Sequence, residues 1–404
     1  MADPTYATAP PARSTTAPSA ARVRDIRLDF FRGIAMFIIL IAHVPGNWVT
    51  LWIPARFGFS DATEIFVFCS GMASAIAFGR VFREQGNVMG TFRVSYRVWQ
   101  VYWAHIGLFF AIAATMVALN AVFPDGRDYV GQLNLYPFFN NAQDNLLGLL
   151  TLTYVPNYFD ILPMYLVILA MLPFVVALAG VSRWLVAAFV IGIWLSASLL
   201  DLNFPAEPWS ERQWFFNPFG WQLIFFTGFA FMSRWLPAPP VDLRLFAVAL
   251  AIVLASVPFA YFRVYNEFTW FLEWRKEWSF LFNKTDFGVL RYIHFLALAY
   301  VAWVLVGPMG ARLRPPDTSG VFATAWQALL TVIMKVGQQS LAVFIASMFL
   351  ARLMGALLDQ VGRTHISMLW VNLLGAAIIV GIAYLAAWYK SAPWKSKRSV
   401  NAAS

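Results

Sequence analysis

The chain has 404 residues and a formal net charge of +9, and 60% of its residues are hydrophobic while only 12% are charged. Such a composition excludes a water-soluble globule, and apolar runs long enough to span a bilayer recur along the chain. The basic residues are scattered at the ends of these runs, which argues against nucleic-acid binding and is typical of topology signals.

We predict three regions. Residues 1–23 are rich in Pro, Ala, Ser and Thr and lack the apolar core of a cleaved signal, so we expect a disordered cytoplasmic tail there. Residues 24–390 form the membrane domain, and residues 391–404 form a basic cytoplasmic tail. Cys69 is the only cysteine, which excludes a disulfide framework and a thiolate metal site.

Hydropathy predicts an all-α polytopic membrane protein with about ten transmembrane helices. Lys and Arg residues gather on the side of the two termini and acidic residues in the three long loops of the other side, so we place both termini in the cytoplasm. The predicted spans are residues 32–52, 61–80, 95–121, 161–180, 183–201, 219–236, 243–262, 287–307, 338–358 and 367–389.

Two segments carry packing signals. Gly71, Ala75 and Gly79 stand at four-residue spacing in the second span, so they share one helix face on which another backbone can approach closely. We expect the first span to be the partner of this face. Residues 322–335 are amphipathic and are expected to lie along the inner membrane interface rather than to cross it.

The first span brings a histidine, His43, near the middle of the membrane. It lies roughly 16 Å along a helix from Arg32, in a hydrocarbon core about 30 Å thick. An ionisable side chain at that depth costs free energy and indicates a function; a hydrogen bond to a neighbouring helix is the alternative. Pro45 and Gly46 are expected to break or kink the helix, and a broken helix at this depth indicates a cavity.

Two carboxylates, Asp61 and Glu64, begin the second span on one helical face. Either of them would orient the imidazole of His43 as a general base by accepting a hydrogen bond from its other ring nitrogen. Asn47 and Ser70 are candidate donors to an oxyanion. No spacing among the four histidines makes a metal site, so we predict none.

Charged residues at the inner ends of the first and third spans would form a basic mouth for the phosphates of a cytosolic donor. A simple ion pair between Asp29 and Arg32 is the alternative. No Walker-type or GxGxxG loop occurs, so ATP- or dinucleotide-dependent chemistry is not expected. The candidate donor-binding residues are Arg27, Asp29, Arg32, Arg93 and Arg97.

Five segments of the chain resemble the OpgC family, within the acyltransferase family 3 superfamily of membrane acyltransferases. The resemblance covers residues 24–390. The segments are Arg27-Leu-Asp-Phe-Phe-Arg-Gly33 followed by His43, Asp61–Gly71, Asn217–Gln222, Arg291–His294 and Gly337–Phe344.

This resemblance implies a bacterial inner-membrane enzyme that succinylates osmoregulated periplasmic glucans from cytosolic succinyl-CoA, with His43 catalytic and no permanently bound cofactor. The implied partners are the lipid bilayer, succinyl-CoA, a periplasmic glucan and the glucan-synthesis machinery. The superfamily often has Arg-x-Arg before the third helix, whereas this chain has Arg93 and Arg97, so the arginine that contacts CoA stays open. The acceptor-side candidates are Asn217, Trp221, Gln222, Lys284, Arg291 and His294.

Alternatives remain at this stage. Ten spans, a broken helix and buried charges also suit a transporter, although no inverted repeat relates the two halves. The substrate could be another glycan or another acyl donor, and the chain could be a non-catalytic subunit of a glucan-synthesis assembly. Direct transfer and a covalent acyl-histidine relay are not distinguished by the sequence.

Overall fold

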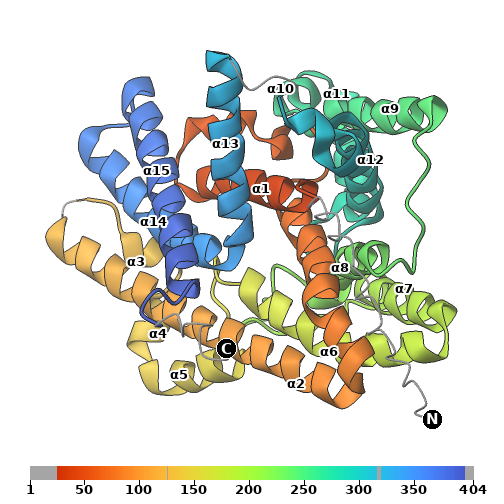
Figure 1. Ribbon diagram of the computed structural model, residues 1–404. Coiled ribbons are helices and arrows are strands. Elements are labelled where there is room, and N and C mark those ends of the chain that lie inside the picture. Colours follow the sequence, from red (N-terminus) through yellow and green to blue (C-terminus); the bar gives the residue numbers. More distant parts are fainter. Residues whose placement is uncertain (1–24, 125, 316–319, 396–404) are drawn as a thin grey trace, which may run out of the picture.

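A computed structural model describes residues 25–124, 126–315 and 320–395 (Figure 1). The regular elements of this part are helices, and one isolated bridge joins Pro205 and Gln213. It confirms an all-α protein with several helices long and apolar enough to cross a membrane; ten spans and the side of the termini stay predictions. The tail predicted at residues 1–23 lies outside the described residues. Within the described residues, the six long apolar helices are α2 (Ala62–Val122), α6 (Ile161–Val181), α9 (Leu243–Ala260), α12 (Val289–Val306), α14 (Ser340–Val361) and α15 (His365–Lys390).

The main hydrophobic core lies where α1, α2, α6, α8, α14 and α15 pack together. The elements not yet named are shorter or less apolar than the six long helices. These elements are α1 (Arg27–His43), η1 (Trp48–Trp52), η2 (Pro54–Arg56), α3 (Tyr129–Gln132), α4 (Tyr136–Asn140), α5 (Ala142–Thr151), α7 (Arg183–Leu199), α8 (Pro218–Met232), α10 (Phe262–Glu267), α11 (Thr269–Glu277), η3 (Ser279–Phe282), η4 (Pro308–Leu313) and α13 (Val321–Gln338).

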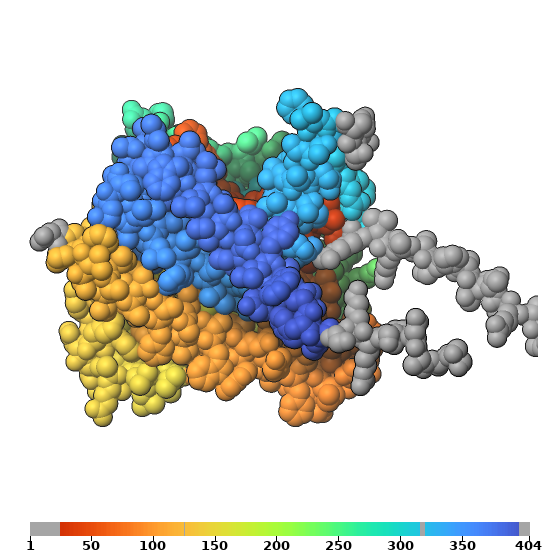
Figure 2. Space-filling model, turned by 60° about the vertical axis from the view of Figure 1, so that its left-hand side comes forward, coloured from red at the N-terminus to blue at the C-terminus, as the bar shows by residue number. Residues whose placement is uncertain are grey.

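The second and third predicted spans are the two halves of α2, which bends at Gly86. Gly86 has a φ of +82° inside an otherwise helical element, a backbone conformation that favours glycine. After the bend, the second half of α2 runs beneath α14 and α15 toward α3 (Figure 1). Figure 2 shows α14 and α15 in blue resting on this orange half, with a hollow between α13 and the α14–α15 pair where the N-terminal part of the described chain is seen at depth.

The break predicted in the first span is confirmed. Helix α1 ends at His43, not at residue 52, and the chain resumes as η1 after a turn in which Gly46 has a φ of +66°. The amide of Asn47 donates to the carbonyl oxygen of Ile41 at 3.2 Å, which satisfies one of the carbonyls that a helix end leaves unpaired. Arg363 donates to the carbonyl oxygen of Pro45 and holds the turn from outside.

The amphipathic stretch forms α13, which crosses α1 at backbone contact (Figure 1). A Cβ atom added at Gly33 would lie 2.0 Å from the carbonyl oxygen of Ile333, and one added at Gly337 would lie 1.9 Å from that of Asp29. The two helices therefore meet through glycines on both sides. The expected place of α13 along the inner membrane interface stays a prediction.

The small-residue face of α2 does pack closely, but its partner is α8 and not α1. A Cβ atom at Gly71 would lie 1.9 Å from the carbonyl oxygen of Phe225, and one at Gly228 would lie 2.2 Å from that of Phe68. Glycines on both helices permit this contact. The sequence showed that one face was small, but the choice of partner depends on how the helices are arranged in space.

Replacing Gly71 by valine is expected to destabilise the fold by about 3 kcal/mol or more, because the new side chain overlaps the backbone of α8. The measurement is the fraction of monodisperse protein in detergent and its thermal unfolding temperature. Gly107→Val in the same helix is the matched control, since nothing lies within 4 Å of the added Cβ there. Equal unfolding temperatures for the two variants would contradict the prediction.

Candidate functional site

His43 is the last residue of α1 and is half-buried. Its Nδ1 atom lies 2.7 Å from the carbonyl oxygen of Ile39, one turn back. Because a carbonyl oxygen only accepts, this contact requires a proton on Nδ1, and in the neutral ring the lone pair is then on Nε2. Nε2 has no hydrogen-bond partner within the described part of the chain, so the ring is in the form in which Nε2 can take up a proton.

A cavity of about 490 Å³ lies at the broken end of α1. His43 lines it together with the turn from Val44 to Asn47, and Thr50 and Arg56 line it from the two short 3-10 helices. Arg352, from the middle of α14, lines it as well. The expectation that the helix break marks a cavity is therefore met.

Tyr158 connects His43 with Arg352. Its ring meets the imidazole of His43 edge to face with centroids 5.4 Å apart, and the guanidinium carbon of Arg352 lies 3.8 Å above the same ring. The hydroxyl of Tyr158 donates to the carbonyl oxygen of Met348 at 2.6 Å. Arg352 is not among the residues predicted from the sequence, although an arginine inside an apolar span is itself a functional signal.

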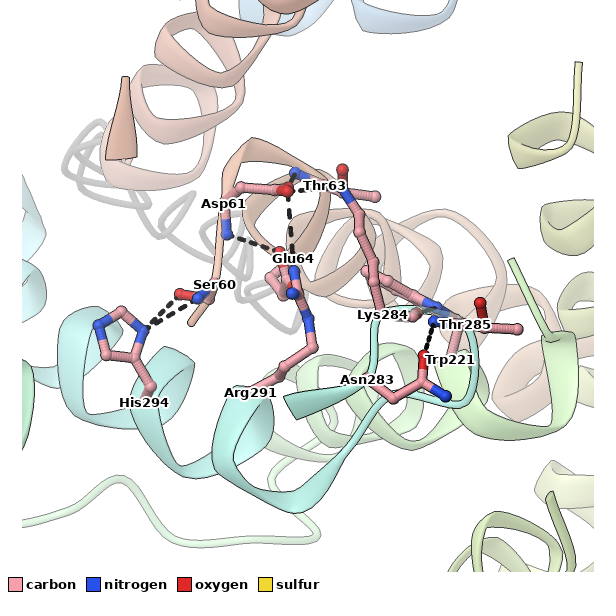
Figure 3. A network of polar contacts seen from close by, with 10 residues as sticks. All are labelled: Ser60, Asp61, Thr63, Glu64, Trp221, Asn283, Lys284, Thr285, Arg291 and His294. Atoms are coloured by element: carbon pink, nitrogen blue, oxygen red, sulfur yellow. Dashed lines mark hydrogen bonds and ion pairs between the residues drawn. The ribbon is translucent and has the colours of Figure 1, made fainter. Parts of the chain in front are cut away.

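The two carboxylates at the start of α2 bind cations from α12 and the loop before it (Figure 3). Glu64 is fully buried, and its Oε1 accepts from Nε of Arg291 at 2.7 Å and also from Nη2. Oδ2 of Asp61 lies 2.5 Å from Nζ of Lys284. Asp61 and Glu64 also form a capping box, in which Asp61 accepts from the backbone N–H of Thr63 and Glu64 from that of Asp61.

The expected hydrogen bond from His43 to Glu64 or Asp61 is therefore absent, and this part of the predicted mechanism is corrected. The acceptor on Nδ1 is a backbone carbonyl, because Arg291 and Lys284 occupy the carboxylates. His43 and the ion pairs at the start of α2 still interact electrostatically, since the charges of Arg352, Lys284 and Asp61 all act on His43.

A second cavity, of about 110 Å³, adjoins the first, with Ala55 lining both. Asp61, Arg291 and Arg275 line it, together with two aromatic rings, Phe59 and Phe282, which stack with centroids 5.3 Å apart. Aromatic side chains with a few polar groups are the usual lining of a ligand-binding pocket.

His294 lies beside this second cavity and approaches the loop before α2. Its Nδ1 lies 2.8 Å from the hydroxyl of Ser60 (Figure 3). A Cβ atom at Gly58 would lie 2.2 Å from Nε2 of His294, so only glycine leaves room for the imidazole. Arg291 and His294 thus face the same region.

Three other acceptor-side candidates have structural contacts. Asn217 caps α8 and donates to Oδ1 of Asp286 at 2.9 Å, and Trp221 donates to the carbonyl oxygen of Lys284 at 2.9 Å. Both hold the loop that carries Lys284, and burial raises the pKa of the Asp286 carboxyl in that loop. Gln222 donates to a carbonyl of α7 at 2.8 Å and lines neither cavity.

The two oxyanion candidates are placed differently from the expectation. Both amide hydrogens of Asn47 are used, by the carbonyl oxygen of Ile41 and by Oδ1 of Asn372 at 2.9 Å. Ser70 is buried inside α2 and lines neither cavity. Asn47 instead secures the helix break, and a role in oxyanion binding has no geometric support for either residue.

Some of the predicted donor-binding residues meet where α1 reaches the junction of α13 and α14. Arg32 donates to the hydroxyl of Ser340, and Asp29 accepts from the amide of Gln338 at 3.2 Å. The charges of Arg32 and Arg97 both act on Lys390, the last residue of α15. Lys390 was not selected from the sequence, because its apparent role was to mark the end of a span.

The other two predicted donor-binding arginines make contacts elsewhere. Arg27 forms an ion pair with Asp25 and lies 5.7 Å from the centre of the Trp303 ring. Arg93 is exposed on the second half of α2 and lies 6.0 Å from the centre of the Tyr96 ring. The basic group at this end is therefore Arg32, Arg97 and Lys390.

The sequence model of a family described as "OpgC protein" matches residues 24–391. The chain belongs to the OpgC family. Membership supports an OpgC-type function in glucan modification and suggests an acyltransferase. The OpgC match spans both cavities and the basic group, so the whole site lies within it. No curated protein and no solved structure matches the chain.

Proposed function

We propose that this OpgC-family chain is an inner-membrane O-acyltransferase that moves a succinyl group from succinyl-CoA to hydroxyls of periplasmic glucans. The observation that carries the proposal is the position of His43 at the wall of a cavity of about 490 Å³, with Nδ1 held by a backbone carbonyl and Nε2 left to accept a proton. A neutral imidazole with its other nitrogen held by a fixed acceptor is a suitable general base.

In the proposed reaction, Nε2 of His43 accepts the proton of a glucan hydroxyl while the hydroxyl oxygen attacks the thioester carbon. The carbonyl oxygen of Ile39 stabilises the positive imidazolium that forms, through the hydrogen bond from Nδ1. The tetrahedral intermediate then expels the thiolate of CoA, which receives the proton from Nε2. The products are an ester and free CoA.

The two ends of α1 supply the two substrate sites in this proposal. Arg32, Arg97 and Lys390 are suited to the phosphates of CoA at the end predicted to be cytoplasmic. Along the helix, Arg32 and His43 are roughly 16 Å apart, a distance that the extended arm of CoA has to bridge. The glucan would enter at the opposite end, beside the stacked rings of Phe59 and Phe282.

The test is a transfer assay with purified, detergent-solubilised protein, radiolabelled succinyl-CoA and periplasmic glucan. We expect label on the glucan, and less label when acetyl-CoA replaces succinyl-CoA at the same concentration. Protein that is demonstrably folded and transfers neither acyl group would contradict the proposal.

Replacing Arg32 by glutamine is expected to raise the KM for succinyl-CoA by roughly tenfold, because a charged hydrogen bond to a phosphate contributes about 1.5–3 kcal/mol. Steady-state kinetics with varied succinyl-CoA measures this effect. Arg183→Gln, at an exposed arginine on α7, is the matched control and should keep the wild-type KM. Equal KM values for both variants would place the donor elsewhere.

A further inference from the structure

Arg352 carries a charge inside an apolar helix without a compensating carboxylate. Within the described residues no ion pair involves Arg352, and its Nε atom is buried without a hydrogen-bond partner. The other charges near His43 are compensated, since Lys284 pairs with Asp61 and Arg291 with Glu64. Burying a charge without a counter-charge is costly, and an anion bound in the cavity would compensate the charge of Arg352.

The surroundings of Arg352 hold it in place for such an anion. Its guanidinium carbon lies 3.8 Å from the centre of the Tyr158 ring, and a guanidinium held over a ring face can still donate to a carboxylate from its edge. Tyr158 has a φ of +87°, a strained conformation for a residue with a side chain, and its hydroxyl donates to the carbonyl oxygen of Met348 in α14. Strain of this kind persists where the surrounding structure requires one position.

The same cavity is lined by Arg352, from α14, and by His43, the proposed base at the end of α1. Arg56 lines it as well, but this arginine is exposed, so water can satisfy its charge. An anion bound by Arg352 would lie in the space that an acyl group attached near His43 has to occupy.

We propose that Arg352 binds the free carboxylate of the acyl group and so makes the site select a dicarboxylic acyl donor over an uncharged acyl donor of equal length. This assignment rests on the proposed function, in which the acyl group is transferred beside His43. It adds a specificity-determining residue on α14 to the general base on α1. A bidentate contact between the guanidinium and the carboxylate is the geometry expected for this pair.

The first experiment compares succinyl-CoA with butyryl-CoA, which has the same number of acyl carbons and no carboxylate. In Arg352→Gln we expect kcat/KM for succinyl-CoA to fall by roughly 100-fold, while that for butyryl-CoA stays near the wild-type value. Arg56→Gln is the matched control and should leave the ratio between the two donors unchanged. An equal fall for both donors in Arg352→Gln would assign Arg352 to the reaction itself or to folding, and would overturn the proposal.

The second experiment does not need turnover. Two inert thioethers of CoA, one ending in a carboxylate and one uncharged, are titrated into wild-type and variant protein by calorimetry. We expect the wild type to prefer the carboxylate by roughly 10- to 100-fold, and Arg352→Gln to lose this preference. If that variant does not fold, Arg352→Lys should retain a weakened preference, because its ammonium keeps the charge without the planar fork.

The outcomes separate the two proposals. A carboxylate preference in binding without transfer from any donor would reject the transferase reaction and retain the role of Arg352. Transfer without such a preference in the wild type would reject the role of Arg352 alone. A carboxylate preference that is measured only with glucan already bearing carboxylates, and not between the two acyl donors, would place the bound anion on the acceptor. That result would also overturn the assignment.

Discussion

Replacing His43 by alanine is expected to lower the rate of succinyl transfer by about 10²–10⁴-fold, the usual contribution of a general base. The variant removes Nε2, the acceptor that faces the cavity, and leaves the glucan hydroxyl without a base at that position. Because the hydroxyl is then a weak nucleophile, kcat should fall while the KM for succinyl-CoA changes little. The measurement is the initial rate of label transfer at saturating donor.

Two controls make this result specific. His365→Ala removes an exposed histidine at the start of α15 and should transfer at the wild-type rate. The unfolding temperature and elution profile of the His43 variant should match those of the wild type, since the side chain is half-buried and its hydrogen bond is made to its own helix. A folded His43→Ala protein that transfers at the wild-type rate would remove His43 from the chemistry.

Replacing Arg291 by leucine is expected to destabilise the protein by about 3–5 kcal/mol, because the change leaves Glu64 buried without its cation. Asp61 also loses a positive neighbour, since its Oδ2 lies 3.7 Å from Nη2 of Arg291. The measurement is thermal unfolding in detergent, with the yield of monodisperse protein as a second readout. Unfolding at the wild-type temperature would mean that the pair contributes little to stability.

A double variant separates the lost pair from the lost side chain. Glu64→Gln combined with Arg291→Met removes both charges, and glutamine can still accept the backbone N–H of Asp61, so most of the stability should return. Glu84→Gln breaks the exposed ion pair with Arg80 and should change stability by no more than about 0.5 kcal/mol. This contrast follows from burial, because water screens the exposed pair of Arg80 and Glu84 but not the buried pair of Arg291 and Glu64.

Several properties of this protein could be predicted from local sequence. Runs of apolar residues identify membrane helices because each span has to satisfy its own backbone in lipid. The break after His43 was predictable because Pro45 and Gly46 act on the adjacent backbone alone. His43 itself was selected because an ionisable residue in an apolar run is visible without knowledge of its neighbours. Family motifs along the chain pointed to the same site.

Other properties depended on contacts between distant segments. The sequence showed two carboxylates beside a histidine, but Glu64 binds Arg291, which lies 227 positions away, and not His43. Gly71 meets α8 rather than α1, and Arg352 reaches the His43 cavity only because α14 packs beside α1. Charge pairing and close packing depend on distance in space. The sequence alone therefore determined which chemical groups are available, and the tertiary structure decided which of them meet.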